Sequence, residues 1–597
     1  MAIPGRKSVK LNQAKSGTYG EFGHGANVEV RFIQGIIKHD WLDNIKLIEE
    51  IEGSDRWDVR DLFQRNVDHQ RVGDSLLPYL KDDTKVKFFA PLTLVLLPMK
   101  NQEVVGDLEI AVQSEETMEG DNYTSIELPE YFKFLKHDSP EYSLVNWSSE
   151  NVKLVAVDGQ HRLTALKRWK DENDLGMLEH MDIPVVIVGF FKATETESSP
   201  TLLEVVRKTF VYINSKAQSI NESRRILLDD EDIWSVCTQE IVQYAHTNDQ
   251  KDSISLNQSA MPLMMIDWRG EERKSAHILS PSALFSVKDI YDWLNQFILP
   301  GEKNNFEKKA IPRLKLDLQI PEFSSENFPL SHADSETVRE AFKSDLMGSM
   351  LAVIEGMDPF QKYIQSVREI QERSEAQTGD VGKIAFKWLC FGKNSSHMIN
   401  TLGIDEQYAV LTQELTQAKE THIEYLLTLD IGLRAVWSAF SILKDETDRF
   451  QKRSSDWLVF SQLFLGPLNK IYRDGWFGQY EVFDSDKKNF MHHIAYSLGG
   501  GIVNYRSSDV LKGYGALLSV LVAKEFMDGK LLSAVWNNQK DSLLSTYKKG
   551  AKKHIKIDMN NNFVGTPVAA LAELNRRTNE EAQSWVNKLE SYLEKDT

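Results

Sequence analysis

Between residues 152 and 170 the sequence changes its periodicity once, abruptly. Residues 152–157 (VKLVAV) are mostly apolar and β-branched, which is typical of a buried strand. The pentapeptide DGQHR follows at 158–162, and beyond it apolar side chains recur at threefold spacing: Leu163, Leu166 and Trp169. That spacing is typical of a helix with one face on a core. The pattern therefore predicts a strand, a tight turn and a helix, with DGQHR at the helix N-terminus.

Neighbouring segments extend this alternation. We expect a helix over 39–51, strands over 86–97 and after Pro184, and another helix from Leu202. Farther along, helix-rich composition marks three stretches: 335–375, 400–450 and 510–550. The order predicts an α+β protein, in which a mixed α/β N-terminal domain precedes a mostly α-helical C-terminal region.

The length of 597 residues is too great for one hydrophobic core, since domains average about 150 residues. Shifts in composition give four expected regions. They are a flexible N-terminal segment at 1–28, a domain at 29–240 with a polar insertion near 101–150, a mixed connecting region at 241–350, and a mostly helical domain at 351–597.

The net charge of −18 disfavours nucleic acid at long range, so DNA contact requires a local basic patch. The strongest such patch is KKGAKKHIK at 548–556, and its candidate DNA-binding residues are Lys548, Lys549, Lys552 and Lys553. A solvated loop or a helix end is the alternative, and slightly favoured, interpretation of the same residues. The pair His492–His493 has no partner at metal-ligand spacing, and we expect an ordinary surface or core pair.

Cysteine content and apolar patterning bear on the compartment. Cys237 and Cys390 are too few for a disulfide framework or for a zinc site made of cysteine alone. Scarce cysteine fits a reducing cytosol. The first residues lack the apolar segment of a secretory signal, and no stretch approaches the ~20 apolar residues of a membrane span. We therefore expect a cytoplasmic protein without a membrane partner.

The DGQHR turn has the features of an anion site. A helix N-terminus presents unpaired N–H groups and about half a positive charge. Gly159 lets the backbone approach a ligand closely, while His161 and Arg162 add donors, so phosphate is a natural ligand. A structural interpretation stays open, in which Asp158 is an N-cap, Gly159 a turn residue and Arg162 a surface ion-pair partner.

DGQHR followed by LTAL resembles the signature of the DGQHR-domain family, which includes the DndB proteins of bacterial DNA phosphorothioation systems. That family is similar to the ParB/sulfiredoxin superfamily, whose fold is then implied for this domain. Gly159, Arg162 and Ala165 fall on the ParB phosphate box G-x-x-R-x-x-A. Gln160 stands where sulfiredoxins carry their reactive cysteine, so sulfinic acid reduction is not expected. The resemblance covers roughly residues 55–240.

A second ParB segment, E-N-x-x-R-x-x-L-N, is matched in part. Asn214 and Asn221 fall on its two asparagines, which implies that they contribute to nucleotide binding. Ile213 and Ala217 replace the acid and the arginine that help engage the triphosphate and metal in ParB. This departure leaves CTP specificity and the ParB clamp cycle without support. Helix capping or a turn is the alternative role of the two asparagines.

The resemblance implies nucleotide chemistry. Gly159, Gln160, His161, Arg162 and Ala165 would hold the phosphates of a nucleoside triphosphate, expected to be ATP, together with Mg²⁺. His161 and Arg162 would stabilise charge on phosphoryl oxygens as catalytic residues. Asp158 would orient a water or bind the metal. Hydrolysis would serve a bacterial DNA-modification or antiphage defence system.

Two other functions stay open. In one, the protein is a DndB-like DNA-binding transcriptional regulator. In the other, it is a non-catalytic scaffold that binds other subunits of a DNA-modification or defence complex. The acidic run at 229–232 either supplies a Mg²⁺ carboxylate or forms the first turn of a helix. The oligomeric state is open, a homo-oligomer included.

Overall fold

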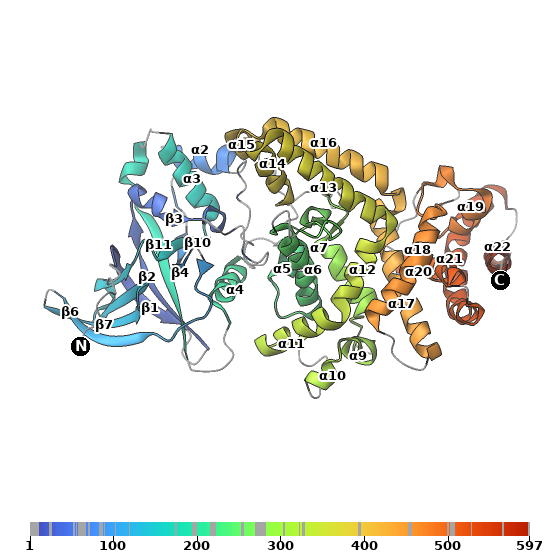
Figure 1. Ribbon diagram of the computed structural model, residues 1–597, viewed down its shortest axis with the longest axis horizontal. Helices are drawn as coiled ribbons and strands as arrows, with labels where there is room; N and C mark the ends of the chain where they lie inside the picture. The colour runs from blue at the N-terminus through green and yellow to red at the C-terminus, as the bar shows by residue number, and fades with distance from the viewer. Residues whose placement is uncertain are drawn as a thin grey trace. The chain divides into compact units, whose positions relative to one another are not determined.

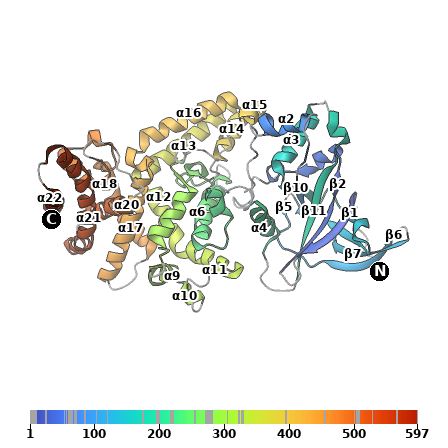
Figure 2. The ribbon, with the colours of Figure 1, turned by 180° about the vertical axis from the view of Figure 1, so that it is seen from behind.

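The chain forms two compact units, residues 1–228 and 229–597. The computed structural model describes residues 11–22, 27–51, 54, 57, 67, 69, 72–82, 87–88, 90–101, 103–118, 120–172, 176–193, 200–214, 222–251, 256–268, 282–302, 305–320, 323–324, 329–391, 396–451, 456–497, 501, 508–526, 528–563 and 566–594. The first unit holds a large sheet and the second is mainly helical, which confirms the expected α+β class (Figures 1 and 2). The division falls at Leu228 rather than at the expected residue 240.

One mixed sheet dominates the first unit. Its strands follow the order β3 (Ile45–Lys46), β10 (Val152–Asp158), β4 (Leu92–Lys100), β11 (Ile183–Lys192), β2 (Val28–Ile37), β1 (Gln13–Phe22), β9 (Ser143–Trp147), β8 (Phe132–His137), β7 (Asp121–Leu128) and β6 (Val112–Met118), with β5 (Glu103–Val104) paired to β4. The β3–β10 and β4–β11 pairs are parallel. Strand β10 therefore has a neighbour on each side, as its apolar sequence requires.

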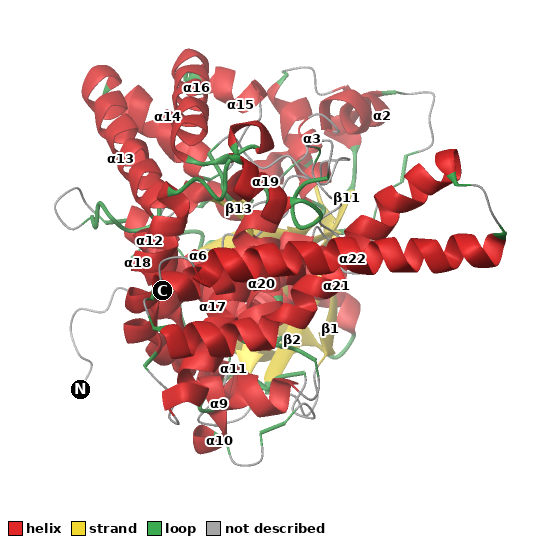
Figure 3. Cartoon of the chain, turned by 90° about the vertical axis from the view of Figure 1, so that its right-hand side faces the viewer, coloured by secondary structure: helices red, strands yellow, loops and turns green. Residues whose placement is uncertain are grey.

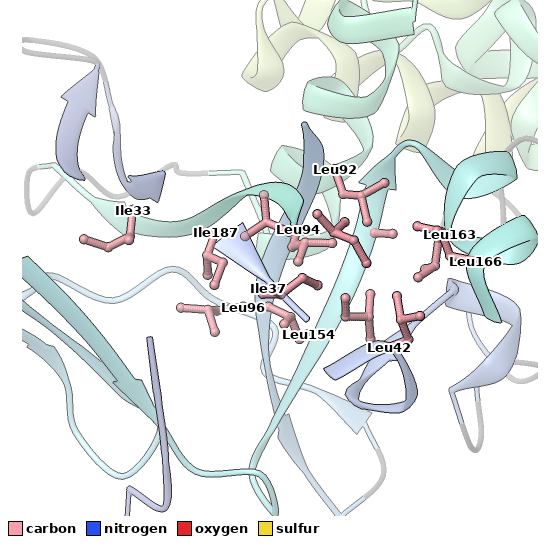
Figure 4. Packing of buried hydrophobic residues seen from close by; sticks show 14 of the residues in the cluster. Ile33, Ile37, Leu42, Leu92, Leu94, Leu96, Leu154, Leu163, Leu166 and Ile187 are labelled. Carbon is pink, nitrogen blue, oxygen red and sulfur yellow. The ribbon is translucent and has the colours of Figure 1, made fainter. Parts of the chain in front are cut away.

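Helix α3 (Gln160–Asp171) packs on β4 and β10 directly after the latter ends. Leu163 and Leu166 are fully buried in the same cluster as Leu92 and Leu154 (Figure 4). Burial of each such side chain contributes about 1.5–3 kcal/mol. The apolar face of α3 thus fixes the position of the turn that joins it to β10.

Within the described residues, the other α-helices of this unit are short or lie at its end. They are α2 (Leu77–Lys81), α4 (Leu202–Asn214) and α5 (Glu222–Leu228). Helix α4 contacts β10, so two helices that follow this strand in sequence, α3 and α4, pack against it.

Three local expectations were wrong. Strand β1 occupies part of the segment expected to be flexible, because β2 and β9 pair with its two edges and stabilise a polar sequence. The expected helix at 39–51 is instead two 3-10 turns, His39–Asn44 and Ile48–Glu50, around β3. Pairing of β3 with β10 overrides the local helical pattern. Strand β4 begins at Leu92, just after Pro91, and not at residue 86.

The second unit consists largely of helices, as expected for 351–597, and it has two short strands, β12 (Ile266–Asp267) and β13 (Phe285–Ser286). Its helices are α6 (Ile233–Asp249), α7 (Val287–Trp293), α9 (Ile311–Leu314), α10 (Leu316–Gln319), α11 (His332–Phe342), α12 (Gly348–Gly356), α13 (Asp358–Thr378), α14 (Asp380–Cys390), α15 (Ser396–Thr401), α16 (Asp405–His422), α17 (Asp430–Gln451), α18 (Trp457–Arg473), α19 (Ser485–Met491), α20 (Ser508–Glu525), α21 (Gly529–Asn562) and α22 (Pro567–Glu594).

Four of the C-terminal helices pack against one another in pairs: α17 on α20, α20 on α21, and α21 on α22 (Figure 3). Aromatic rings fill the core beside α17, where Trp437 lies 5.6 Å from Trp293 and Phe440 lies 5.1 Å from Phe464, measured between ring centroids. Within the described residues, none of the helices combines the length and apolar character needed to cross a lipid bilayer.

Lys419 on α16 gives this unit a testable pH dependence. Burial lowers the pKa of its ammonium group from 10.5 to about 8, against a smaller opposing effect of Asp267. Between these two pH values the unfolded chain binds more protons than the folded chain, so the free energy of unfolding rises with pH. Across this pH window, we expect the free energy of unfolding of wild type to rise by up to about 3 kcal/mol more than that of Lys419→Met. Urea unfolding of both proteins at several pH values measures the gain, and parallel profiles would contradict it.

Candidate functional site: the DGQHR turn

The end of β10 departs from regular strand geometry just before the turn. Its pairing with β4 runs in register from Val152 to Ala156 and then shifts, so that Asp158 lies opposite Thr93. A bulge of this kind bends a strand and re-aims the side chain that follows it. The Asp158 side chain is consequently partly exposed, whereas Val157 before it is fully buried.

Gly159 is the N-cap of α3 and adopts a left-handed conformation, with φ 86° and ψ 18°. A Cβ atom at this position would lie 2.5 Å from Leu92 Cδ2 and 3.0 Å from Arg162 Nη2. Both the backbone angles and the space therefore require glycine. Asp158 is not the N-cap, contrary to the structural interpretation of the sequence, and no side chain caps this helix.

The first turn of α3 contains backbone N–H groups that have no hydrogen-bond acceptor within the helix. Leu163 N–H donates to the Gly159 carbonyl over 2.8 Å, which is the first bond of the helix. The three amides before it, at 160–162, have no intrahelical acceptor by position. They directly follow Gly159, the N-cap residue, in the chain.

Arg162 folds back across the turn. Its Nη2 donates to Asp158 Oδ2 over 3.0 Å, and its Nη1 donates to the Ala90 carbonyl just before β4. The Arg162 side chain is 19% exposed and that of Asp158 is 29% exposed. The guanidinium thus joins the end of β10, the start of α3 and the entry to β4, while one side of the pair faces solvent.

Gln160 occupies the first position of α3 and is only 4% exposed. Its backbone carbonyl accepts a hydrogen bond from Thr164 Oγ1, but its side-chain Nε2 is buried without a hydrogen-bond partner in the structure. Nearly all buried polar groups in proteins are hydrogen-bonded, so this donor needs an explanation. The residue itself lies at the turn, between Gly159 and His161.

The structure gathers only part of the expected phosphate site. Asp158, Gly159, Gln160, His161 and Arg162 form one continuous turn, in which His161 is half-buried. Ala165 instead lies fully buried in the core cluster, where its small side chain lets α3 pack on the sheet. It does not contribute a group to the turn.

The structure describes only one of the two asparagines of the second segment. Asn214 is the last residue of α4, a helix that contacts β10. Asn221 and Ala217 lie outside the described residues. In the acidic run, Asp232 is the N-cap of α6 and accepts from Ser235 N–H over 2.8 Å. The run therefore precedes this helix and does not form its first turn, as one of the two alternatives expected.

The basic patch is neither a loop nor a helix end, since it lies within the 34-residue helix α21. Lys549, Lys552, Lys553 and Lys556 are exposed on one face, while Ala551, Ile555 and Met559 are buried on another. Lys548 is partly buried. The spacing therefore makes a basic stripe on an ordered helix.

Sequence reasoning missed the contributions of Ala90 and Leu92. They reach the turn only because β4 pairs with β10. A cavity of about 290 Å³ also borders β10, but its lining includes Asn151 and Lys153 at the start of the strand, away from Asp158. The turn is thus a surface site and not part of that cavity.

Gly159→Ala tests how strictly the turn depends on glycine. We expect it to lower the free energy of unfolding by about 2–4 kcal/mol, from the left-handed backbone and the contact with Leu92. Gly120→Ala is the matched control, because Gly120 has a φ of 96° but open space around its Cβ position. Urea denaturation compares the two, and equal losses would show that the close packing at Gly159 has no effect.

Comparison of the chain with protein-family models, with curated proteins and with solved structures finds no match.

Proposed function

We propose that the DGQHR turn binds the phosphates of a nucleoside triphosphate, with ATP the expected one, and that the protein hydrolyses it within a bacterial DNA-modification or antiphage defence system. The proposal assigns a ParB/sulfiredoxin-like fold to the domain that contains the turn. The observation that carries it is the buried Gln160 amide, which has no partner in the structure and lies at the start of α3 beside Gly159. A phosphate oxygen would accept from this donor, whose isolation otherwise costs about 1–3 kcal/mol.

The ion pair across the turn suggests how binding and metal recruitment are linked. A triphosphate carries more negative charge than one carboxylate and accepts both arms of a guanidinium, so Arg162 would exchange Asp158 for phosphate oxygens. Asp158, released from Arg162, would then be an oxygen ligand for Mg²⁺. The amides of the first turn of α3 would bind the same phosphate group.

Hydrolysis then follows from charge stabilisation. A water attacks the terminal phosphorus, the bond to the bridging oxygen breaks, and ADP and inorganic phosphate leave. His161 and Arg162 would donate to the phosphoryl oxygens as charge develops on them. Asp158 would position the metal or the water, since a carboxylate at the strand end is partly exposed and adjacent to the phosphate position.

Asp158→Asn separates binding from turnover. We expect the variant to retain a nucleotide-dependent rise in melting temperature, because Arg162 and the backbone amides are intact. Phosphate release should fall strongly, because the metal ligand is lost. A panel of nucleotides with and without Mg²⁺ provides both readouts. Asp171→Asn, at the exposed end of α3, is the control. Full turnover by Asp158→Asn would refute the role given to Asp158.

A DNA-binding function has its own support in the basic stripe on α21, defined by Lys549, Lys552, Lys553 and Lys556. Lysines at this spacing project from one face of a helix, and their positive charge is complementary to the phosphate backbone of DNA. Because the chain has a net charge of −18, this basic stripe would be the surface that contacts duplex DNA.

We expect neutralising all four lysines to glutamine to reduce the slope of log affinity against log salt by about 3–4, since each phosphate contact contributes about 0.9. Fluorescence anisotropy with a duplex measures this slope. The charge-matched control replaces exposed lysines on other helical segments: Lys308, Lys362, Lys383 and Lys530. Equal slopes for the two variants would exclude the stripe as the DNA contact.

A further inference from the structure

Two histidines and a glutamate meet in the helical unit, far from one another in sequence. His554 lies on α21, Glu581 on α22, and His493 in the segment that follows α19. Their ligand atoms all lie within 4.8 Å of one another. Glu581 reaches both histidines, with Oε2 3.2 Å from His554 Nε2 and Oε1 3.7 Å from His493 Nε2. The two imidazole rings are parallel, with an interplanar angle of 5° and centroids 5.3 Å apart.

The placement of His493 is structurally demanding. It has a φ of 64°, a left-handed conformation that non-glycine side chains rarely adopt. Its backbone N–H is fixed by a 2.7 Å hydrogen bond to the Tyr496 carbonyl. Opposite it, Gly550 lies within α21, and a Cβ atom there would overlap His493. Glycine inside a helix costs about 1 kcal/mol. The positive φ of His493 and the glycine in α21 are therefore both unfavourable, and together they allow this imidazole to lie where it does.

An ordinary ion pair explains the contact between His554 and Glu581 but not the position of His493. His554 and Glu581 are partly exposed and close enough for a hydrogen bond. His493, however, is only 6% exposed, and its Nε2 has no hydrogen-bond partner, since 3.7 Å to Glu581 is too long for one. The neighbouring His492 turns away, with its Nε2 2.7 Å from the Tyr480 hydroxyl. A buried imidazole nitrogen that faces a carboxylate and a second imidazole nitrogen is the arrangement of a metal ligand.

We propose that His493, His554 and Glu581 bind a divalent transition-metal ion of the Zn²⁺ class. Two imidazole nitrogens and one carboxylate oxygen are ligands that Zn²⁺ favours. Bonds of about 2.0–2.1 Å in tetrahedral geometry place ligand atoms roughly 3.4 Å apart, so the three groups need only small side-chain movements. His554 and Glu581 border solvent, which leaves the fourth position for water.

The ion would join three elements that are distant in sequence. Helices α21 and α22 already pack together (Figure 3), and the metal would add the segment after α19 to them. Binding of the ion to the folded chain alone stabilises it by mass action. The site is separate from the DGQHR turn, which belongs to the other unit, and its presence does not depend on nucleotide binding.

The test uses the full-length protein without a histidine tag, stripped with a chelator and titrated with ZnCl₂ by calorimetry. We expect one equivalent bound, a rise in melting temperature, and tetrahedral visible absorption with CoCl₂ in place of zinc. His554→Gln and Glu581→Gln should each lose the heat and the temperature shift. Glu580→Gln, one position earlier on α22 and paired with Arg576, should bind as wild type does.

The variants are compared only after circular dichroism shows wild-type helix content, and both ligands are exposed enough for substitution without a buried cavity. Absence of binding by wild type to both metals would overturn the proposal. So would wild-type affinity in both His554→Gln and Glu581→Gln, because the metal would then be bound elsewhere.

Discussion

Arg162→Ala is expected to lower nucleoside triphosphate turnover by at least about 1000-fold, the effect of removing an arginine that stabilises charge on a transferred phosphoryl group. In the structure this guanidinium spans the turn between Asp158 and the Ala90 carbonyl. Its loss removes the donor that the phosphate would take over and leaves Asp158 opposite the incoming charge. Phosphate release by the purified full-length protein, at saturating ATP and Mg²⁺, is the measurement.

Arg168→Ala is the matched control, because Arg168 is a partly buried arginine on the same helix, nearly two turns farther along. Arg162→Lys should recover little activity, since an ammonium group does not bind two oxygens in the bidentate manner of a guanidinium. Equal turnover in Arg162→Ala and Arg168→Ala would place the chemistry outside the DGQHR turn.

Arg339→Leu is expected to lower the free energy of unfolding of the helical unit by about 3–5 kcal/mol, because breaking a buried ion pair strands its partner in the interior. Arg339 on α11 is almost fully buried and donates to Glu240 on α6, which is 9% exposed. The same guanidinium also lies 3.7 Å from Asp230. Removing it leaves Glu240 and Asp230 without this counter-charge.

The midpoint of the urea transition, followed by tryptophan fluorescence, reports the loss. Arg373→Leu is the control: Arg373 pairs with Glu414 over 3.0 Å, but both side chains are exposed. Exposed pairs contribute about 0–1 kcal/mol, so this variant should unfold near the wild-type midpoint. If the two variants shifted the midpoint equally, the buried network would not have the structural importance given to it.

Elements with strong local signals were predicted from sequence. β10, α3, β11 and α4 appear where the apolar periodicity placed them. Each depends on side chains close in sequence, either an apolar run or a threefold spacing. The strand–turn–helix geometry of DGQHR was therefore accessible from the sequence alone.

Features that depend on distant pairing were not accessible. The strand character of residues 13–22 comes from β2 and β9, and the Arg162 bond to Ala90 depends on the pairing of β4 with β10. The spacing of His493, His554 and Glu581 carries no motif, because three packed segments bring them together. Local pattern predicts elements, whereas such contacts follow from their tertiary arrangement.

Hydrogen exchange at the first turn of α3 tests most directly whether phosphate binds there. Amides at 160–162 have no intrahelical acceptor by position, and a bound phosphate would supply one. With ATP and Mg²⁺, we predict slower exchange in a peptide that covers residues 158–163, and unchanged exchange in peptides from α21. ATP binding shown by calorimetry without any protection of residues 158–163 would contradict the proposed site.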